Sequence, residues 1–333
     1  MTISAPAGAP RWAWLAAAVC LALVVPTLVE AWQVNQAFLV VNHQPALLAG
    51  GGNPDSLAYV ERQLTRVVDR GSGSASVRRM LAVARRSLGA DWAGGVSLPE
   101  LVRWGRQRQQ AGDHAAAAFL FAWAAERAPA VADYWYYLGT AYQGQAHWEA
   151  ALTAYQRAVE AGEWLQLGPG DAFLAQGIVY QTAWPETQLE AARASWQRAL
   201  ADGGFSGPLA EAQAHYRLAE VILWHDRNPA GALPHYEAAL ALDPADHWAR
   251  LRLGYTIYWG KGDVAAAERT ILAAIAQWPG DSHLKWPYFY LGEIYADAGL
   301  WPQAAAAYVQ VLSLDPEDGR VRQRLAEVNG QLP

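Results

Sequence analysis

The residues that most often do chemistry are sparse in this 333-residue chain and are not grouped. Its eight histidines are scattered without a His-Glu-x-x-His pair, the spacing that places two metal ligands on one helix face. The single cysteine, Cys20, excludes a disulfide framework and a site built from several thiolates. His225 and Asp226 are adjacent near a predicted helix end, which is typical of a solvated cap or surface pair. We therefore expect no metal and no cofactor.

Candidate nucleophiles also lack the context that activates them. Ser72 and Ser74 lie in a Gly-Ser run, without the strand, turn and helix that expose a catalytic serine. No Gly-rich loop ends in Lys-Ser or Lys-Thr, so a phosphate cradle is absent from the sequence. We predict that the chain is not an enzyme.

Composition and charge narrow the class of protein further. With 53% apolar and 17% charged residues, the chain can bury a core and is not intrinsically disordered. Its net charge of −6 gives no polyanion-binding signature. We expect no nucleic-acid partner.

The N-terminal segment has the features of a membrane helix. Trp12 to Val29 is an uncharged run long enough to cross a bilayer. Trp12 and Trp14 lie at one end of it and Trp32 lies beyond the other end, where indole side chains prefer the level of the lipid headgroups. Two alternatives stay open. Pro26 and the small residues before a cut after Ala31 fit a cleaved signal peptide, and the run could instead be a buried core helix.

Charge placement predicts the orientation of this segment. Arg11 precedes the span, and no Lys or Arg follows before Arg62, so the positive-inside rule puts the N-terminus in the cytoplasm. We therefore expect a single-pass membrane protein with an extracytoplasmic C-terminal part, or export after signal cleavage.

A basic helical segment comes next. Residues 42–56 are rich in Pro, Gly and Asn and indicate a linker, and helices are expected over Leu57–Arg70 and Val77–Leu88. Residues 55–110 hold 10 Arg against 5 acids, whereas residues 111–333 carry a net −11. The basic helices either lean on anionic headgroups or present an ordinary solvated face.

From about residue 98 the sequence repeats itself. Small and large residues recur in one order over two predicted helices, and the two clearest copies contain Trp135, Leu138, Gly139, Tyr142, Ala151, Tyr155 and Ala158, then Tyr288, Leu291, Gly292, Tyr295, Ala304, Tyr308 and Pro316. This pattern resembles the tetratricopeptide repeat (TPR), a pair of antiparallel helices with a period of 34 residues. The resemblance implies a scaffold that binds a protein or peptide partner.

The resemblance extends over six copies. They lie near 98–131, 132–165, 170–205, 212–246, 247–280 and 285–318, and the third has the least secure helix pairing because it ends in the Gly-rich run DGGFSGP. Around them we place a cytoplasmic lead at 1–11, an anchor or signal at 12–32, a linker at 33–56, a basic segment at 57–97 and a capping helix with tail at 319–333. The predicted fold is all-α, a right-handed α-solenoid of about six hairpins.

Packing explains the residue types of the repeat. Where two helices cross closely, Gly or Ala is required, and Gly139, Gly254 and Gly292 take this place on first helices. Proline ends repeats because it cannot continue a helix, as at Pro244 and Pro316. We assign five tryptophans to the core between helices: Trp104, Trp123, Trp135, Trp148 and Trp196.

First helices of TPR hairpins line a concave surface, whose inward positions the register predicts. The predicted partner-binding groove consists of Tyr136, Thr140, Tyr216, Glu220, Trp224, Trp248, Tyr255, Tyr258, Trp259, Trp286, Phe289 and Glu293. The same register also points Val102, Arg106, Gln109, Asp133, Gln143, Leu174, Ile178, Gln181 and Leu251 inward. Aromatic residues concentrate toward the C-terminal half, where each either contacts a ligand or packs between repeats.

The Lys, Asn and Arg clamp with which some TPR domains hold a C-terminal carboxylate has no counterpart here, because the matching stretch reads Asp133, Tyr136 and Thr140. The leading hypothesis is a membrane-tethered TPR scaffold that recruits a protein or peptide within a cell-envelope complex. Alternatives are a glycan as ligand of the groove Trp and Tyr, and a structural spacer.

Overall fold

A computed structural model describes residues 54–69, 78, 81–82, 84–85, 97–278, 280 and 283–331. The all-α prediction is confirmed for these residues, in which an isolated bridge between Val131 and Glu163 is the sole β pairing. The helices are α2 (Pro54–Asp69), α4 (Leu98–Gln110), α5 (His114–Arg127), α6 (Ala132–Gly144), α7 (Trp148–Ala161), α8 (Pro169–Ala183), α9 (Leu189–Asp202), α10 (Pro208–Trp224), α11 (Pro229–Leu242), α12 (His247–Lys261), α13 (Val264–Gln277), α14 (Lys285–Asp297), α15 (Trp301–Leu314) and α16 (Gly319–Asn329).

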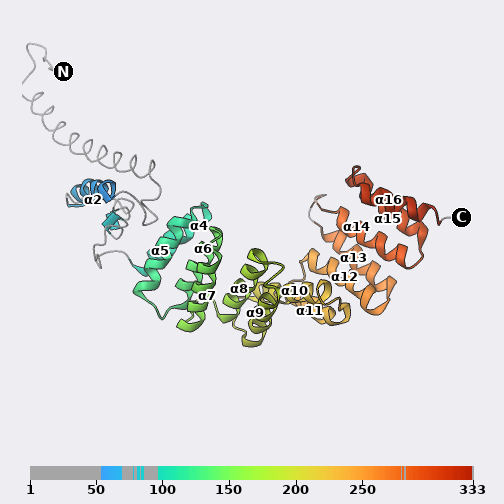
Figure 1. Cartoon of the computed structure of the whole chain (residues 1–333), viewed down its shortest axis with the longest axis horizontal. Helices are drawn as coiled ribbons and strands as arrows, with labels where there is room; N and C mark the ends of the chain where they lie inside the picture. The colour runs from blue at the N-terminus through green and yellow to red at the C-terminus, as the bar shows by residue number, and fades with distance from the viewer. Residues whose placement is uncertain are drawn as a thin grey trace, which may run out of the picture. The chain divides into compact units, whose positions relative to one another are not determined.

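The chain forms two compact units, which are described separately. The first comprises residues 1–130 and 137–150, and the second comprises residues 131–136 and 151–333. Helices α8 to α16 all belong to the second unit, where they follow one another in chain order (Figure 1). Each predicted repeat contains two of the helices from α4 to α15, and α16 occupies the place of the predicted capping helix.

The predictions for the N-terminal part of the chain fall only in part on residues that the structure describes. Helix α2 begins at Pro54, three residues before the predicted start at Leu57, because proline fits the first turn of a helix. Within the predicted helix Val77–Leu88, the described residues are helical, and Arg85 Nε lies 2.9 Å from Glu61 Oε1 of α2. The predicted anchor or signal at 12–32 lies outside the described residues. Among the helices that are described, none is both long and apolar enough for a membrane crossing.

Short acidic side chains start several of the repeat helices. Asp113, Asp246, Asp263 and Asp318 precede α5, α12, α13 and α16, and each accepts a hydrogen bond from the backbone N–H three residues later. Such an N-cap satisfies a backbone donor that the helix itself leaves free. Polar residues between the apolar runs therefore define where each helix begins.

The third hairpin, α8 and α9, is held by a buried carboxylate. Asp171 is 4% exposed and accepts hydrogen bonds from the backbone N–H groups of Gly168 and Ser206 and from the Ser206 hydroxyl. These bonds tie the Gly-rich segment after α9 to the start of α8. Trp196 of α9 is fully buried, and its indole N–H donates to the Leu174 carbonyl of α8 at 3.3 Å. The pairing that was least secure in the sequence is thus specified by Asp171 and Trp196.

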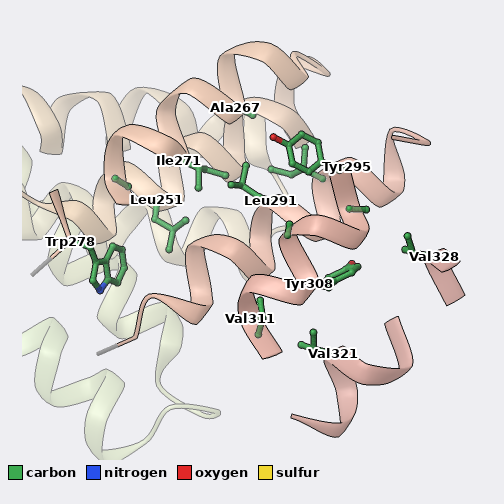
Figure 2. Packing of buried hydrophobic residues seen from close by; sticks show 14 residues of the cluster. Leu251, Ala267, Ile271, Trp278, Leu291, Tyr295, Tyr308, Val311, Val321 and Val328 are labelled. Carbon is green, nitrogen blue, oxygen red and sulfur yellow. The ribbon is translucent and has the colours of Figure 1, made fainter. Parts of the chain in front are cut away.

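The largest described core cluster joins α12 to α16 (Figure 2). Leu251, Ile271, Leu291 and Tyr308 each expose at most 3% of their surface within it. At Gly292 a Cβ atom would lie 2.5 Å from a ring carbon of Tyr308, so α14 and α15 approach too closely for any larger residue without a shift. The hairpins α12–α13 and α14–α15 and helix α16 bury their apolar faces against one another, as neighbouring repeats do.

Several positions that the sequence register pointed into the groove are buried in the structure. Leu174 and Leu251 are 5% and 0% exposed, and they pack in helix-helix cores. Asp133 is 2% exposed and accepts hydrogen bonds from the backbone N–H groups of Leu165 and Gln166. These groove predictions are wrong, because first helices also turn side chains toward the next hairpin.

The tryptophans assigned to the core divide into two groups. Trp104, Trp123 and Trp196 are buried at 7% exposure or less, as predicted. Trp135 and Trp148 are half-buried, and the Arg157 guanidinium lies 5.0 Å above the Trp135 ring. A register position that favours a large side chain does not by itself enclose the whole indole.

Candidate functional site on the C-terminal helices

An aromatic pocket of about 480 Å³ lies on the second unit. Its lining comes from α10, α12 and α14, each the first helix of a hairpin, and from α16. Trp224 comes from α10, Tyr255 and Trp259 come from α12, and α14 and α16 supply the rest of the lining, which consists of Trp286, Phe289, Tyr290, Glu293, Arg320 and Arg324. We call this site the aromatic pocket. Its volume falls in the range of small-ligand and side-chain sites.

The rings of the pocket are packed against one another. The Trp224 and Tyr255 rings stack with centroids 5.3 Å apart, and Tyr290 meets Tyr255 edge-on at 4.9 Å. Trp259 lies 6.0 Å from Tyr255 and stays 43% exposed, while Trp224 is 44% exposed. Ring-ring contacts fix these side chains in place. The pocket thus presents large, pre-oriented apolar surface to solvent.

A charge pair forms the polar side of the pocket. Arg324 of α16 donates to both Glu293 oxygens, Nε to Oε1 at 3.0 Å and Nη2 to Oε2 at 2.6 Å. The Tyr308 hydroxyl donates to Glu293 Oε1 at 2.6 Å, and burial together with this carboxylate raises the pKa of the phenol. A bidentate Arg–carboxylate pair is directional as well as strong. It therefore fixes α16 against α14.

A second charge pair lies next to the aromatic pocket. Arg252 Nε of α12 is 3.1 Å from Glu220 Oε1 of α10, which also accepts a hydrogen bond from the Tyr236 hydroxyl. The Arg252 guanidinium lies 5.2 Å from both the Trp224 and the Tyr290 ring centroids, between two walls of the pocket. Burial and the nearby Glu220 raise the pKa of the Tyr216 phenol to about 12. Tyr216 and Glu220 thus support the pocket from behind its walls and do not line it.

These contacts follow one rule of register. We define the close-approach residue as the small residue of each first helix, such as Ala219, Gly254 and Gly292. In these contacts, the residue that directly follows the close-approach residue of one first helix contacts a residue of the next first helix. That second residue lies two positions before the close-approach residue of its own helix. The pairs are Glu220 with Arg252, Tyr255 with Tyr290, and Arg106 of α4 with Tyr137 of α6. In α16, Leu325-Ala326 matches Leu291-Gly292, so Ala326 is the close-approach residue and Arg324 lies two positions before it. Helix α16 is therefore a further first-type helix.

The predicted groove residues reach different places. Trp224, Tyr255, Trp259, Trp286, Phe289 and Glu293 all line the aromatic pocket. The Tyr258 hydroxyl donates to Asp297 Oδ2 at 2.6 Å, and burial with this hydrogen bond raises its pKa to about 12. Asp297 itself lines an adjoining pocket of about 470 Å³, which shares Trp259, Glu293 and Arg324 with the aromatic pocket.

Three predicted groove residues belong to other contacts. Trp248 packs edge-on against Trp278, with ring centroids 4.8 Å apart, in a cluster with His283. Tyr136 packs on Tyr155 at 5.4 Å. Thr140, in the first unit, accepts a hydrogen bond from Gln109 Nε2 at 3.0 Å. These side chains are half-buried, and none of the three lines either of the two described pockets.

Sequence reasoning missed Tyr290, Arg320 and Arg324 as pocket residues. Arg320 and Arg324 lie in the segment predicted as a capping helix, 319–333, and both line the aromatic pocket. Arg322 does face outward, where it donates to the Pro316 carbonyl. The signal for Arg324 was present in the sequence, because Leu325-Ala326 continues the repeat register into α16.

The described residues contain no cluster of three or more His, Cys, Asp or Glu side chains that could hold a metal ion. What the site offers is a surface for recognition: aromatic rings, paired charges and the Arg320 guanidinium, which lies 4.4 Å from the Phe289 ring centroid. Together with the consecutive hairpins, these features define a helical-repeat protein of the α-solenoid class.

Comparison with known proteins identifies the repeat. A tetratricopeptide repeat model matches residues 102–172, 182–247 and 256–318, which is more than half of the chain, and a second such model matches residues 223–285. The chain therefore belongs to the tetratricopeptide repeat family. Members of this family are generally non-enzymatic scaffolds for protein-protein interaction, so a protein or peptide is the class of partner that its repeats imply.

Solved structures of TPR proteins share the fold. YrrB, described as a TPR protein with an unusual peptide-binding site, is 21% identical with a TM-score of 0.52, and the match covers 62% of this chain and 97% of YrrB. PilF of Pseudomonas aeruginosa is 17% identical with a TM-score of 0.54, over 71% of this chain and 97% of PilF. PilW, a type IV pilus biogenesis factor, is 14% identical with a TM-score of 0.51, over 68% of this chain and 98% of PilW. No curated protein matches the chain.

Proposed function

We propose that this chain is a TPR scaffold that docks a protein or peptide partner in the aromatic pocket between α10, α12, α14 and α16. The observation that carries the proposal is the set of aromatic side chains around one open volume of about 480 Å³, with two indoles more than 40% exposed. Tryptophan and tyrosine supply large contact area with few rotatable bonds, and they dominate the binding energy of many interfaces.

Two features support a peptide or a protruding protein segment as the occupant. Three of the four helices around the pocket, α10, α12 and α14, are first helices of hairpins, which are the helices expected to line the groove. YrrB, which shares the fold, is described as having a peptide-binding site. The charge pairs Glu293–Arg324 and Glu220–Arg252 keep the walls in place before the partner arrives, and such pre-organisation lowers the entropic cost of binding.

The test compares pocket variants with a matched surface variant. The full chain is captured from solubilised membranes, and proteins that copurify in fixed ratio are identified by mass spectrometry. Trp224→Ala with Trp259→Ala should reduce partner recovery about tenfold or more, because both indoles line the pocket. Leu272→Ala, which removes a 46% exposed side chain of α13 outside the pocket, should leave recovery unchanged. Equal recovery with all variants would place the partner elsewhere, and a blank would favour a structural spacer.

Membrane tethering and a place in a cell-envelope complex are part of the proposal. Their support is the uncharged run Trp12–Val29, with Arg11 before it and no Lys or Arg until Arg62. A reporter that is active only in the cytoplasm, fused after Pro333, should stay inactive. An active reporter would contradict this topology.

A glycan is the second candidate ligand, favoured by the partly exposed indoles of Trp224 and Trp259. Flat aromatic faces can stack on the apolar faces of sugar rings. Glycan-array binding that is lost in Trp259→Ala would support this function. The absence of any signal at millimolar glycan would remove it.

A further inference from the structure

The charge of the aromatic pocket selects among peptide ligands. Glu293 already has three donors, two from Arg324 and one from the Tyr308 hydroxyl. Glu220, beside the pocket, is paired with Arg252 and with the Tyr236 hydroxyl. Both described carboxylates at this site are therefore neutralised by the protein itself. A cationic ligand would have to displace one of these pairs.

Arg320 is the cation of the pocket whose charge stays uncompensated among the described residues. Its guanidinium lies over the Phe289 ring, and no described carboxylate forms an ion pair with it. The acids beside it in sequence are engaged elsewhere. Asp315 pairs with Lys285 at 2.6 Å, and Glu317 pairs with Arg322 at 3.0 Å. Asp318 caps α16 by accepting a hydrogen bond from the Val321 backbone N–H.

The ring faces also disfavour a cationic ligand. Aromatic cages bind cations when the ring faces are free, but here guanidinium groups of the protein already cover several of them. Arg252 lies over Trp224 and Tyr290, and Arg320 lies over Phe289. An additional cation would meet like charges, whereas an anion at Arg320 would complete a charge-assisted hydrogen bond.

From these observations we propose that the aromatic pocket recognises an extended peptide segment in which an acidic side chain lies close to an aromatic or large aliphatic side chain. The apolar side chain packs among Trp224, Tyr255 and Trp259, and the carboxylate accepts hydrogen bonds from Arg320. This inference rests on the proposed function, and it adds the chemistry of the partner.

The experiment selects ligands without assuming their sequence. A random twelve-residue peptide library displayed on phage is panned on the full chain, immobilised in detergent micelles, and in parallel on the Trp224→Ala, Trp259→Ala double variant. Peptides enriched on the native chain and depleted on the double variant are expected to carry Asp or Glu within a few residues of Trp, Phe, Leu or Ile. Circular dichroism and melting of each variant confirm that it is folded.

Affinity measurements then test the role of Arg320. The most enriched peptide, synthesised with capped ends and a fluorophore, is titrated by fluorescence anisotropy. Arg320→Gln should weaken binding about tenfold or more, the value of a charged hydrogen bond. Arg322→Gln, the matched control on the outer side of α16, should change affinity less than twofold. Replacing the peptide's acid by its amide should weaken binding to the native chain and leave binding to Arg320→Gln unchanged.

The contrary outcomes separate the two claims. Peptides that depend on Trp224 and Trp259 but are basic or uncharged would overturn the acidic specificity and leave the proposed function standing. Equal effects of Arg320→Gln and Arg322→Gln would overturn it as well. If no peptide depends on Trp224 and Trp259, the proposed function fails together with the inference.

Discussion

Two glutamates of the second unit occupy the same register position and have the same kinds of partner, yet the arginine that pairs with one is mostly enclosed and the arginine that pairs with the other is exposed. Glu220 of α10 and Glu293 of α14 each follow the close-approach residue, and each accepts a tyrosine hydroxyl from the second helix of its hairpin. Each pairs with an arginine of the next first-type helix. The Arg252 side chain is 16% exposed, whereas that of Arg324 is 45% exposed.

The difference arises from what lies beyond each arginine. Arg252 has the rings of Trp224 and Tyr290 beside it, because α12 has a hairpin on either side. Arg324 belongs to α16, the last described helix, and its guanidinium pairs with Glu293 and Glu327 while the side chain stays 45% exposed. Repeat register thus determines which side chains meet, and position in the array determines whether the pair is part of the core or part of a binding surface.

The largest expected effect concerns the leucine that precedes the close-approach residue in α10 and in α14. Leu218 and Leu291 are both 3% exposed, and replacing either with Ala should cost about 2–5 kcal/mol in urea unfolding. Because repeats contact mainly their neighbours, Leu291→Ala should speed hydrogen exchange in α14 to α16 and leave α8 and α9 protected. Uniform exchange through the second unit would contradict the nearest-neighbour description.

The paired arginines should differ in their contribution to stability. Arg252→Met removes a mostly enclosed cation, which is 16% exposed, from Glu220 and should lower the free energy of unfolding by about 2–4 kcal/mol. Arg324→Met at the more exposed pair should cost about 1 kcal/mol or less, because solvent screens it. Chemical denaturation of both variants beside the native chain measures the difference. Equal losses would show that enclosure does not separate the two pairs.

The close-approach residues of the two hairpins should respond differently to one methyl group. The fourth hairpin carries Ala219, which is fully buried, where the sixth carries Gly292. A Cβ at Gly292 would lie 2.5 Å from the Tyr308 ring, so Gly292→Ala should cost about 1–3 kcal/mol by overpacking, although alanine is the better helix former. A melting temperature of Gly292→Ala at or above that of the native chain would mean that Tyr308 moves aside freely.

Much of the fold was predictable because the TPR pattern is redundant: Gly292, Ala304 and Tyr308 each indicate the same crossing of two helices. Local spacing also placed Trp224, Tyr255 and Phe289 on the same surface. It could not separate Leu251, which faces the core, from Trp248 and Tyr255 on the same helix, because burial depends on the next hairpin. Arg324 was missed because α16 repeats the register of a first helix, whereas the sequence analysis assigned residues 319–333 to a capping helix.

A histidine pair distinguishes the fourth hairpin from the sixth. His215 of α10 and His235 of α11 have their Nδ1 atoms 3.1 Å apart, whereas the matching residues of the sixth hairpin are Tyr288 and Ala307. Burial lowers the pKa of both imidazoles. For His215 the nearby Glu211 carboxylate partly opposes this, and for His235 the neighbouring His215 adds to it.

The smallest of the predicted effects is therefore a pH dependence of the fourth hairpin. Because the folded pKa values lie below the unfolded value of about 6.5, the unfolded chain takes up protons first, and stability present above pH 6.5 should be lost as the pH falls below it. The double variant His215→Tyr, His235→Ala, which copies the sixth hairpin, should show a smaller loss between pH 7 and pH 5 in urea titrations. His147→Ala, at an exposed histidine, serves as the control and should keep the native slope. If the double variant also keeps the native pH dependence of stability, a group other than this pair produces the acid sensitivity. The two hairpins then do not differ in the way their histidines suggest.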